Sequence, residues 1–209
     1  MDFPDEYIKD ILDFSSISDL IENLYLKSLI DAYPKVLKID NIQNLDENHI
    51  RDEFQKILCF SSGKLSDLLN SQFVFLGIEN QIIKKDNKRK RTDIEFFIPK
   101  LKYVIECKKL KSVNKTQYIN NGIYRFINHK YIGEFDKYAG MCSFIVNGNI
   151  EYIIKETKKR VEKYQNNNID NKTLCNYDYS FSSTHTKIDK KELLIHHLFF
   201  DMNDKTIPK

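Results

Sequence analysis

Tryptophan is absent from the 209-residue chain, and its four cysteines include no Cys-x-x-Cys pair. The lack of tryptophan, beside many Asn, Lys and Ile residues, reflects an AT-rich genome more than a function. Zinc knuckles are built from closely spaced cysteine pairs, so a zinc site of this kind is not expected. We expect reduced and mostly buried thiols instead, as in a cytosolic protein. The four cysteines are Cys59, Cys107, Cys142 and Cys175.

The chain also lacks a long apolar stretch, since none approaches the ~20 residues needed to cross a bilayer. Its first ten residues, MDFPDEYIKD, are acidic and carry neither the basic nor the apolar region of a signal peptide. Internal repeats and long flexible linkers are absent as well. We therefore expect a cytoplasmic protein with no membrane partner.

A strong excess of one charge is missing too, because the net charge is only +3. Such a balance says little about nucleic acid as a partner, and the local distribution of basic residues matters more. Hydrophobic residues make up 41% and charged residues 30%, which excludes a disordered chain and allows a proper core. The basic residues gather in three ranges, 84–91, 108–111 and 158–163.

The spacing of apolar residues predicts one α/β domain. Residues 5–32 have helical spacing, and Tyr33-Pro34 should end that segment, because a residue before proline is biased away from the helix. Asp46 is suited to be the N-cap of a further helix with an apolar stripe. Strands are predicted at 73–83, 92–98, 102–110, 141–146, 178–184 and 192–200, and helical segments at 46–59, 65–69, 117–138 and 150–164.

The informative stretch lies on two of these strands. Asp93 is on the first, and Glu106-Cys107-Lys108 follows on the second across a tight turn. Because side chains alternate across a strand, Glu106 and Lys108 should point to one face and their apolar neighbours to the other. If the hairpin pairs in register, Asp93 lies beside Glu106. The alternative is a hairpin whose acids and lysines form a solvated face.

Two carboxylates that lie side by side in this way repel each other. Each raises the pKa of the other unless a cation lies between them. Mg²⁺ is the expected occupant, with Mn²⁺ as an alternative, because hard divalent ions prefer oxygen ligands. We predict that Asp93, Glu106 and the backbone carbonyl of Cys107 bind this metal. The metal would polarise a phosphoryl oxygen and acidify a water, while Lys108 orients that water or stabilises charge on phosphorus.

Asp93 followed by Glu106-x-Lys108, with an apolar strand around each, resembles the signature of the PD-(D/E)xK, or restriction-endonuclease-like, nuclease superfamily. Thr92 stands where the motif name has proline, which is a frequent departure. In this superfamily the Asp and Glu bind the metal and the Lys acts on the water. Less diagnostic segments extend the resemblance over roughly residues 45–201.

The resemblance implies a restriction-endonuclease-like fold, in which helices flank a central mixed β-sheet. The nuclease domain would occupy 45–209, preceded by an N-terminal helical extension at 1–44. An acidic residue from an upstream helix often assists in this superfamily. Glu47 is our choice, because helical spacing places it on the face of the apolar stripe, and Glu53 is the alternative.

Contacts with nucleic acid are expected from basic residues near the motif. The loop at 84–91 directly precedes the strand of Asp93. It either binds the phosphate backbone of the nucleic acid or is a solvated hairpin loop. Arg125 and Lys130 follow the Glu-x-Lys strand and are either phosphate contacts or ordinary surface charges. The predicted contacts are Lys88, Arg89, Lys90, Arg91, Arg125 and Lys130.

Three histidines lie on the last predicted strands. His185 is either close to the scissile phosphate or a satisfied polar residue at a strand end. His196 and His197 are neighbours on a strand and therefore face opposite ways. They are not suited to bind one metal, and we interpret them as structural.

These observations predict a Mg²⁺-dependent endonuclease that cleaves DNA, as the nuclease effector of a prokaryotic anti-phage defence or restriction system. The chain has no obvious room for a separate recognition domain, so a partner protein that targets or restrains it is expected, and a homodimer is left open. Two alternatives remain: a catalytically silent nucleic-acid-binding or scaffold subunit of a defence complex, and an interaction protein built around the N-terminal helices. The complete Asp, Glu and Lys set argues against the silent subunit.

Overall fold

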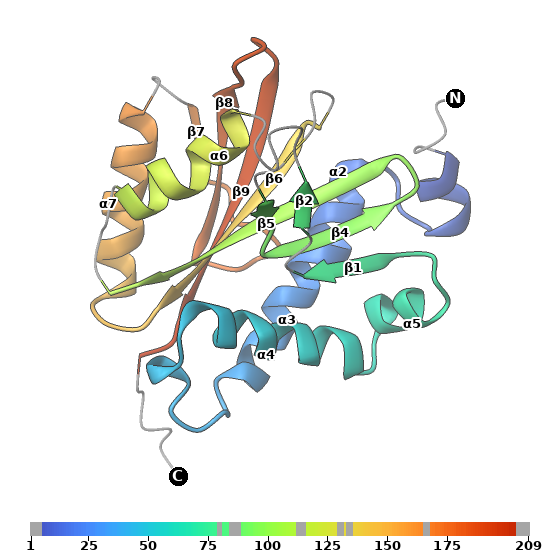
Figure 1. The fold of residues 1–209 in the computed structure, drawn as a ribbon, viewed down its shortest axis with the longest axis horizontal. Helices are drawn as coiled ribbons and strands as arrows, with labels where there is room; N and C mark the ends of the chain where they lie inside the picture. The colour runs from blue at the N-terminus through green and yellow to red at the C-terminus, as the bar shows by residue number, and fades with distance from the viewer. Residues whose placement is uncertain are drawn as a thin grey trace.

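A mixed β-sheet with helices on both faces forms the protein (Figure 1). The computed structural model describes residues 6–78, 81–83, 89–111, 116–128, 132, 136–164 and 168–203, with the backbone alone at 78, 81–83, 89–91 and 116. The strands are β1 (Phe75–Ile78), β2 (Gln81–Ile83), β3 (Arg89–Arg91), β4 (Ile94–Ile98), β5 (Leu101–Leu110), β6 (Tyr138–Ile145), β7 (Asn168–Asp170), β8 (Ser180–Thr186) and β9 (Glu192–Asp201). Seven of them form the sheet, in the order β1-β4-β5-β6-β9-β8-β7, and β2 pairs with β3 in a separate ribbon.

The three central strands of the sheet run in parallel. β5 pairs with β6 and β6 with β9 in this way, whereas the outer strands pair antiparallel. Strands that are covered on both faces become nearly continuous apolar runs. The sequence of β6, YAGMCSFI, is buried from Ala139 to Ile145. The core therefore lies on both sides of β5, β6 and β9.

Helices cover both faces of this sheet. They are η1 (Tyr7–Ile11), α2 (Ile17–Leu20), η2 (Ile21–Leu26), α3 (Lys27–Val36), η3 (Ile42–Asn44), α4 (Glu47–Phe60), α5 (Lys64–Asn70), η4 (Thr116–Ile123), α6 (Tyr124–Ile127) and α7 (Ile150–Lys163). On one face Tyr25 of η2 stacks on Phe96, with ring centroids 4.4 Å apart. On the other face Phe126 of α6 and Val161 of α7 are buried in a second apolar cluster. In Figure 1, α6 and α7 lie at the left, and α4 and α5 lie along the lower part.

The N-terminal helical segment runs further than predicted. α3 continues through Pro34 to Val36, so the prediction that Tyr33-Pro34 ends the helix is wrong. Contacts with β9 hold Tyr33 in the helix: its hydroxyl donates to the carbonyl of Asp201 at 2.7 Å, and its ring packs against Phe200. Pro34 lies in the last turn, where its missing N–H costs the helix a single hydrogen bond.

The N-terminal helices and the sheet share one hydrophobic cluster. Leu20 and Leu29 are completely buried in the cluster that also contains Phe96 of β4. The division into an extension at 1–44 and a domain at 45–209 stays a prediction, but the two ranges are joined by packing. The helices therefore form one layer of the core.

Most of the other predicted elements are present with shifted ends. The predicted N-cap of α4 is confirmed, because the Asp46 side chain accepts a hydrogen bond from the N–H of His49. The helical zone predicted at 117–138 is confirmed by η4 and α6 as far as Ile127 and is wrong at Tyr138, where β6 begins, while 129–131 and 133–135 lie outside the described residues. The strand predicted at 73–83 is divided between β1 and β2, which belong to different sheets.

The cysteines agree with a further expectation. All four cysteines have free thiols, as predicted. Cys107 and Cys142 are buried, whereas Cys59 and Cys175 are partly buried. Among the helices of the described ranges, none is both long and apolar enough to cross a membrane.

Candidate active site

The polar residues of the motif meet at an uncovered edge of β5. β4 pairs with β5 only as far as Ile105, although β5 continues to Leu110. Asp93 directly precedes β4, and its Oδ2 accepts a hydrogen bond from the N–H of Cys107 at 2.7 Å. The end of one strand thus places a carboxylate against the edge of its neighbour.

Glu47 reaches the same edge from the helix side. It is the first residue of α4, directly after the N-cap Asp46. Its Oε2 accepts a hydrogen bond from the N–H of Lys109 at 2.6 Å, and its Oε1 lies 3.5 Å from Nζ of Lys108. Two carboxylates therefore bond to the N–H groups of alternate residues along the open edge of β5.

Glu106 and Lys108 lie at the centre of this group. Both side chains are buried, with exposed fractions of 2% and 7%. Nζ of Lys108 donates to Oε1 of Glu106 at 2.6 Å and to the backbone carbonyl of Cys107 at 2.7 Å. The lysine ammonium therefore lies among Glu106, Glu47 and the carbonyl that was predicted as a metal ligand.

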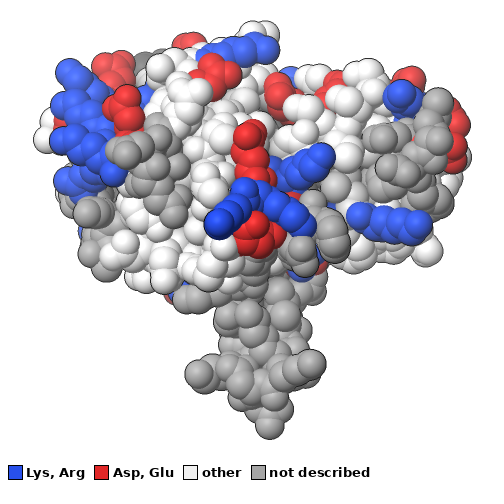
Figure 2. Space-filling model, turned by 90° about the horizontal axis from the view of Figure 1, so that it is seen from above, with Lys and Arg blue, Asp and Glu red and all other residues white. Residues whose placement is uncertain are grey.

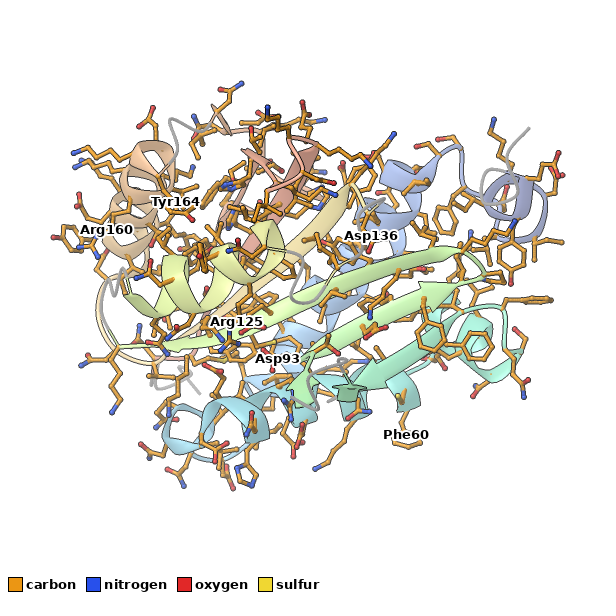
Figure 3. All side chains as sticks on the ribbon, turned by 45° about the horizontal axis from the view of Figure 1, so that its top comes forward. Phe60, Asp93, Arg125, Asp136, Arg160 and Tyr164 are labelled. Atoms are coloured by element: carbon orange, nitrogen blue, oxygen red, sulfur yellow. The ribbon has the colours of Figure 1, made fainter. Side chains whose placement is uncertain are left out.

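Arg125 approaches Glu106 from α6. Its Nη1 donates to Oε1 of Glu106 at 2.8 Å, so this one oxygen accepts from two cationic side chains. The second oxygen, Oε2, is buried and has no hydrogen-bond partner among the residues that the structure describes. Figure 3 shows Arg125 and Asp93 close to each other, between the ribbons of α4 and α6.

The sequence interpretation missed two residues of the site. Arg51 of α4 is buried, with Nη1 at 3.4 Å from Oδ1 of Asp93 and Nη2 at 2.7 Å from Oδ1 of Asp52. It follows Glu47 by one helical turn, and that spacing would have placed it on the same face. Gln117 of η4 donates to the carbonyl of Lys109 at 3.1 Å, and no local pattern in the sequence indicates this contact.

Burial and charge shift the pKa values at the site. Burial raises the pKa of Glu106 to about 7, the Asp93 charge adds to this effect, and Lys108 and Arg125 oppose it. Burial alone would lower the pKa of Lys108, but the carboxylates of Glu106 and Glu47 outweigh it and raise the pKa. The lysine is therefore held as an ammonium, while burial shifts Glu106 toward its protonated form and the two cations favour the carboxylate.

A hard divalent cation fits the donors at this site. Asp93 and Glu106 offer carboxylate oxygens and Cys107 offers a carbonyl, which are ligands that Mg²⁺ prefers. The unpartnered Oε2 of Glu106 is a buried acceptor that a cation would satisfy. In the part of the chain that the structure describes, no three side chains of His, Cys, Asp or Glu form a metal-binding group. The fit therefore depends on two carboxylates and a backbone carbonyl.

Some predicted residues do not join this group. Glu53 of α4 pairs with Lys56 at 2.5 Å. Lys88 and Lys130 lie outside the described residues, and for 89–91 only the backbone of β3 is described. β3 ends at Arg91, two positions before Asp93, so the basic ribbon leads directly into the site.

The histidines lie away from the β5 edge. His185 is on β8, which is separated from β5 by β6 and β9, so the structure does not bring it to the predicted site. His185 and His197 each hydrogen-bond to Ser183 at 2.7 Å. His196 instead contacts the Tyr103 hydroxyl at 3.2 Å, in the opposite layer. The prediction that His196 and His197 face opposite ways is confirmed.

Comparisons with known proteins add no relative. No family model, no curated protein and no solved structure matches the chain.

Proposed function

We propose that this protein is a metal-dependent nuclease that hydrolyses phosphodiester bonds of DNA. The observation that carries the proposal is the meeting of Asp93, Glu106, Lys108 and Glu47 at the open edge of β5. One buried carboxylate oxygen there has no partner within the described ranges. The resemblance to the PD-(D/E)xK superfamily assigns the same residue types to this chemistry. A mixed sheet with helices on both faces is compatible with the restriction-endonuclease-like fold that we propose with it.

The residues that would hold Mg²⁺ or Mn²⁺ are Asp93, Glu106 and, through its carbonyl, Cys107. When bound, the cation would supply polarisation of a phosphoryl oxygen and a lowered pKa for a nearby water. Asp93 and Glu106 form the acid pair of the site. Glu106 is buried, and burial lowers the local dielectric and strengthens its electrostatic interactions.

Lys108 provides the positive charge that faces the reaction. Its raised pKa keeps the ammonium charged at neutral pH, so it can orient a water or stabilise the charge that develops on phosphorus. Glu47 holds this ammonium on one side and the backbone of Lys109 on the other. Arg51 holds Asp93 in place from α4 and balances its charge.

The biological role of the proposed nuclease follows from the resemblance. We place it as the effector of a prokaryotic anti-phage defence or restriction system, targeted or restrained by a partner protein. A silent binding subunit would need no buried acidic pair with a lysine beside it, since bare carboxylates repel phosphates. The complete set therefore favours the enzyme.

Digestion assays test the proposal. We expect the purified full chain to cleave plasmid or phage DNA with Mg²⁺ or Mn²⁺ and to be inactive with EDTA, with single-stranded DNA and RNA run beside them. Asp93→Asn should reduce the rate at least about a hundredfold while the protein folds, because Asn still accepts the Cys107 N–H. Lys155→Ala, an exposed change on α7, is the matched control. A wild-type rate in Asp93→Asn would contradict the proposal.

A further inference from the structure

The two cations that share Oε1 of Glu106 differ in their access to solvent. The Lys108 side chain is 7% exposed and also bonds to the Cys107 carbonyl. The Arg125 side chain extends from α6 and is 35% exposed. Lys108 is thus fixed inside the protein, whereas Arg125 pairs with Glu106 from the solvent side.

A divalent cation at the acid pair would compete with Arg125 for Glu106. The carboxylate would then face the dication, the ammonium of Lys108 and the guanidinium at once, and like charges at such distances repel strongly in a buried site. Arg125 is the member that can leave, because its side chain reaches solvent. Lys108 is held by Glu47 as well as by Glu106.

The helix that carries Arg125 keeps its guanidinium close to the site after such a release. Its neighbours Phe126 and Ile127 are buried in the core, so α6 stays in place while the side chain turns. A guanidinium presents several N–H groups in a planar fork that matches a phosphate. The released group would thus be positioned for a phosphate that enters beside the acid pair.

We propose that Arg125 couples metal binding to nucleic-acid binding. In the metal-free protein it is the counter-ion of Glu106, and when a divalent cation occupies the acid pair it moves to a substrate phosphate. This inference rests on the proposed nuclease function and adds its regulation. Because coupling between two binding events is reciprocal, nucleic acid would also strengthen metal binding.

The test compares affinity for DNA with and without Ca²⁺, which has looser coordination than Mg²⁺ and is expected to support binding with little cleavage. Fluorescence anisotropy of a labelled duplex is measured with the full-length wild type and with Arg125→Ala. Without metal the two should bind equally, because Arg125 is occupied by Glu106. With Ca²⁺ the variant should bind about tenfold more weakly or worse, the loss of one charge-assisted contact.

Two matched variants separate this exchange from a fixed contact. Lys and Arg side chains gather at the left of Figure 2, the end of the molecule formed by α7 in Figure 1. Arg160 of α7, labelled in Figure 3, lies well apart from Asp93 and Arg125. Arg160→Ala should change the affinity by the same factor with and without Ca²⁺. Arg125→Lys keeps the charge and should show a smaller loss of DNA affinity, again only with Ca²⁺. This variant keeps the test valid if Arg125→Ala misfolds.

Removing the charge of Glu106 gives an independent readout. Glu106→Gln weakens the hold on Arg125, so its metal-free affinity for DNA should rise several-fold, and the gain should vanish in the double variant Glu106→Gln, Arg125→Ala. Equal losses for Arg125→Ala with and without Ca²⁺ would overturn the coupling alone. Coupling without hydrolysis by the wild type in Mg²⁺ would overturn the nuclease function alone. A wild type that binds no nucleic acid under any condition would overturn both.

Discussion

Two groups of polar side chains are buried against the sheet, and they differ in charge. At the edge of β5, Glu106 and Lys108 form an ion pair. On β8 and β9, His185 and His197 are joined through the hydroxyl of Ser183. Counting only the described part of the chain, each group leaves one atom without a hydrogen-bond partner, Oε2 of Glu106 and Nδ1 of His185. Only the unpartnered oxygen of Glu106 lies among charged side chains, so only this atom is suited to bind a cation.

Burial favours the neutral form of both acids and histidines. It raises the pKa of Glu106 to about 7 and lowers that of His185 to about 4. The histidine group is therefore neutral at physiological pH and serves as packing. Lys108 keeps its charge because two carboxylates outweigh its burial, and a buried charge held by partners of opposite sign is typical of a functional site.

The largest expected difference between the two groups concerns activity. Lys108→Ala should reduce the cleavage rate at least a hundredfold, a loss of roughly 3 kcal/mol or more of transition-state stabilisation. It also leaves Glu106 without its ammonium, so the variant should melt lower at pH 8 than at pH 6, where the carboxyl is protonated. Digestion time courses and melting curves check both. An unchanged rate in a folded variant would remove Lys108 from the site.

The pH dependence of stability should show the two groups acting in opposite directions. The pKa of His185 in the histidine group, and that of His196 in the opposite layer, is about 4 in the folded protein, against 6.5 in the unfolded chain. Between pH 6.5 and 4 the unfolded chain thus binds more protons than the folded protein. Each histidine should lower the free energy of unfolding by about 3 kcal/mol as the pH falls through this range. The pKa of Glu106 is about 7 against 4.5, so its contribution is full below pH 4.5 and is lost as the pH rises to about 7.

Glu106→Gln separates these contributions. The variant lacks the acid that gains stability on acidification, so its unfolding free energy should fall more steeply than that of the wild type between pH 6.5 and 4.5. Denaturant unfolding at several pH values measures both slopes. Parallel curves would mean that Glu106 has an ordinary pKa in the folded protein.

The reverse of the lysine result is expected for the histidine group. His197→Ala removes hydrogen bonds to Tyr118 and Ser183 and leaves a cavity, and it should cost roughly 2 kcal/mol or more of stability. The cleavage rate per folded molecule should stay unchanged. The fraction of folded protein is measured before the assay, and the rate is divided by it. A rate per folded molecule that falls as far as that of Lys108→Ala would show that the histidine group also acts in cleavage.

The smallest effect is expected at the rim of the charged group. Glu47→Gln still accepts the N–H of Lys109 but removes a charge 3.5 Å from the Lys108 ammonium. The rate should fall about tenfold, or roughly 1.4 kcal/mol, with little change in stability. Glu53→Gln is the matched control on the same helix, and it should cleave normally. The opposite ranking would make Glu53 the assisting acid.

Local rules in the sequence determined much of the site. Strand alternation places Glu106 and Lys108 on one face, and the N-cap at Asp46 fixes the start of α4 and hence Glu47. The hairpin register that the motif required is present, since Ile94 pairs with Ile105 next to Asp93 and Glu106. These relations act over a few residues, so composition and spacing suffice to predict them.

Only the tertiary structure decided which charges meet. Arg51 and Asp93 are 42 positions apart, and Glu106 and Arg125 are 19 apart, so no periodicity relates them. The continuation of α3 through Pro34 likewise depends on contacts with β9, which override the local bias of the residue before proline. The packing of helices on the sheet decides which residues lie close in space. Buried charges and rings need partners, and only the neighbouring elements can supply them.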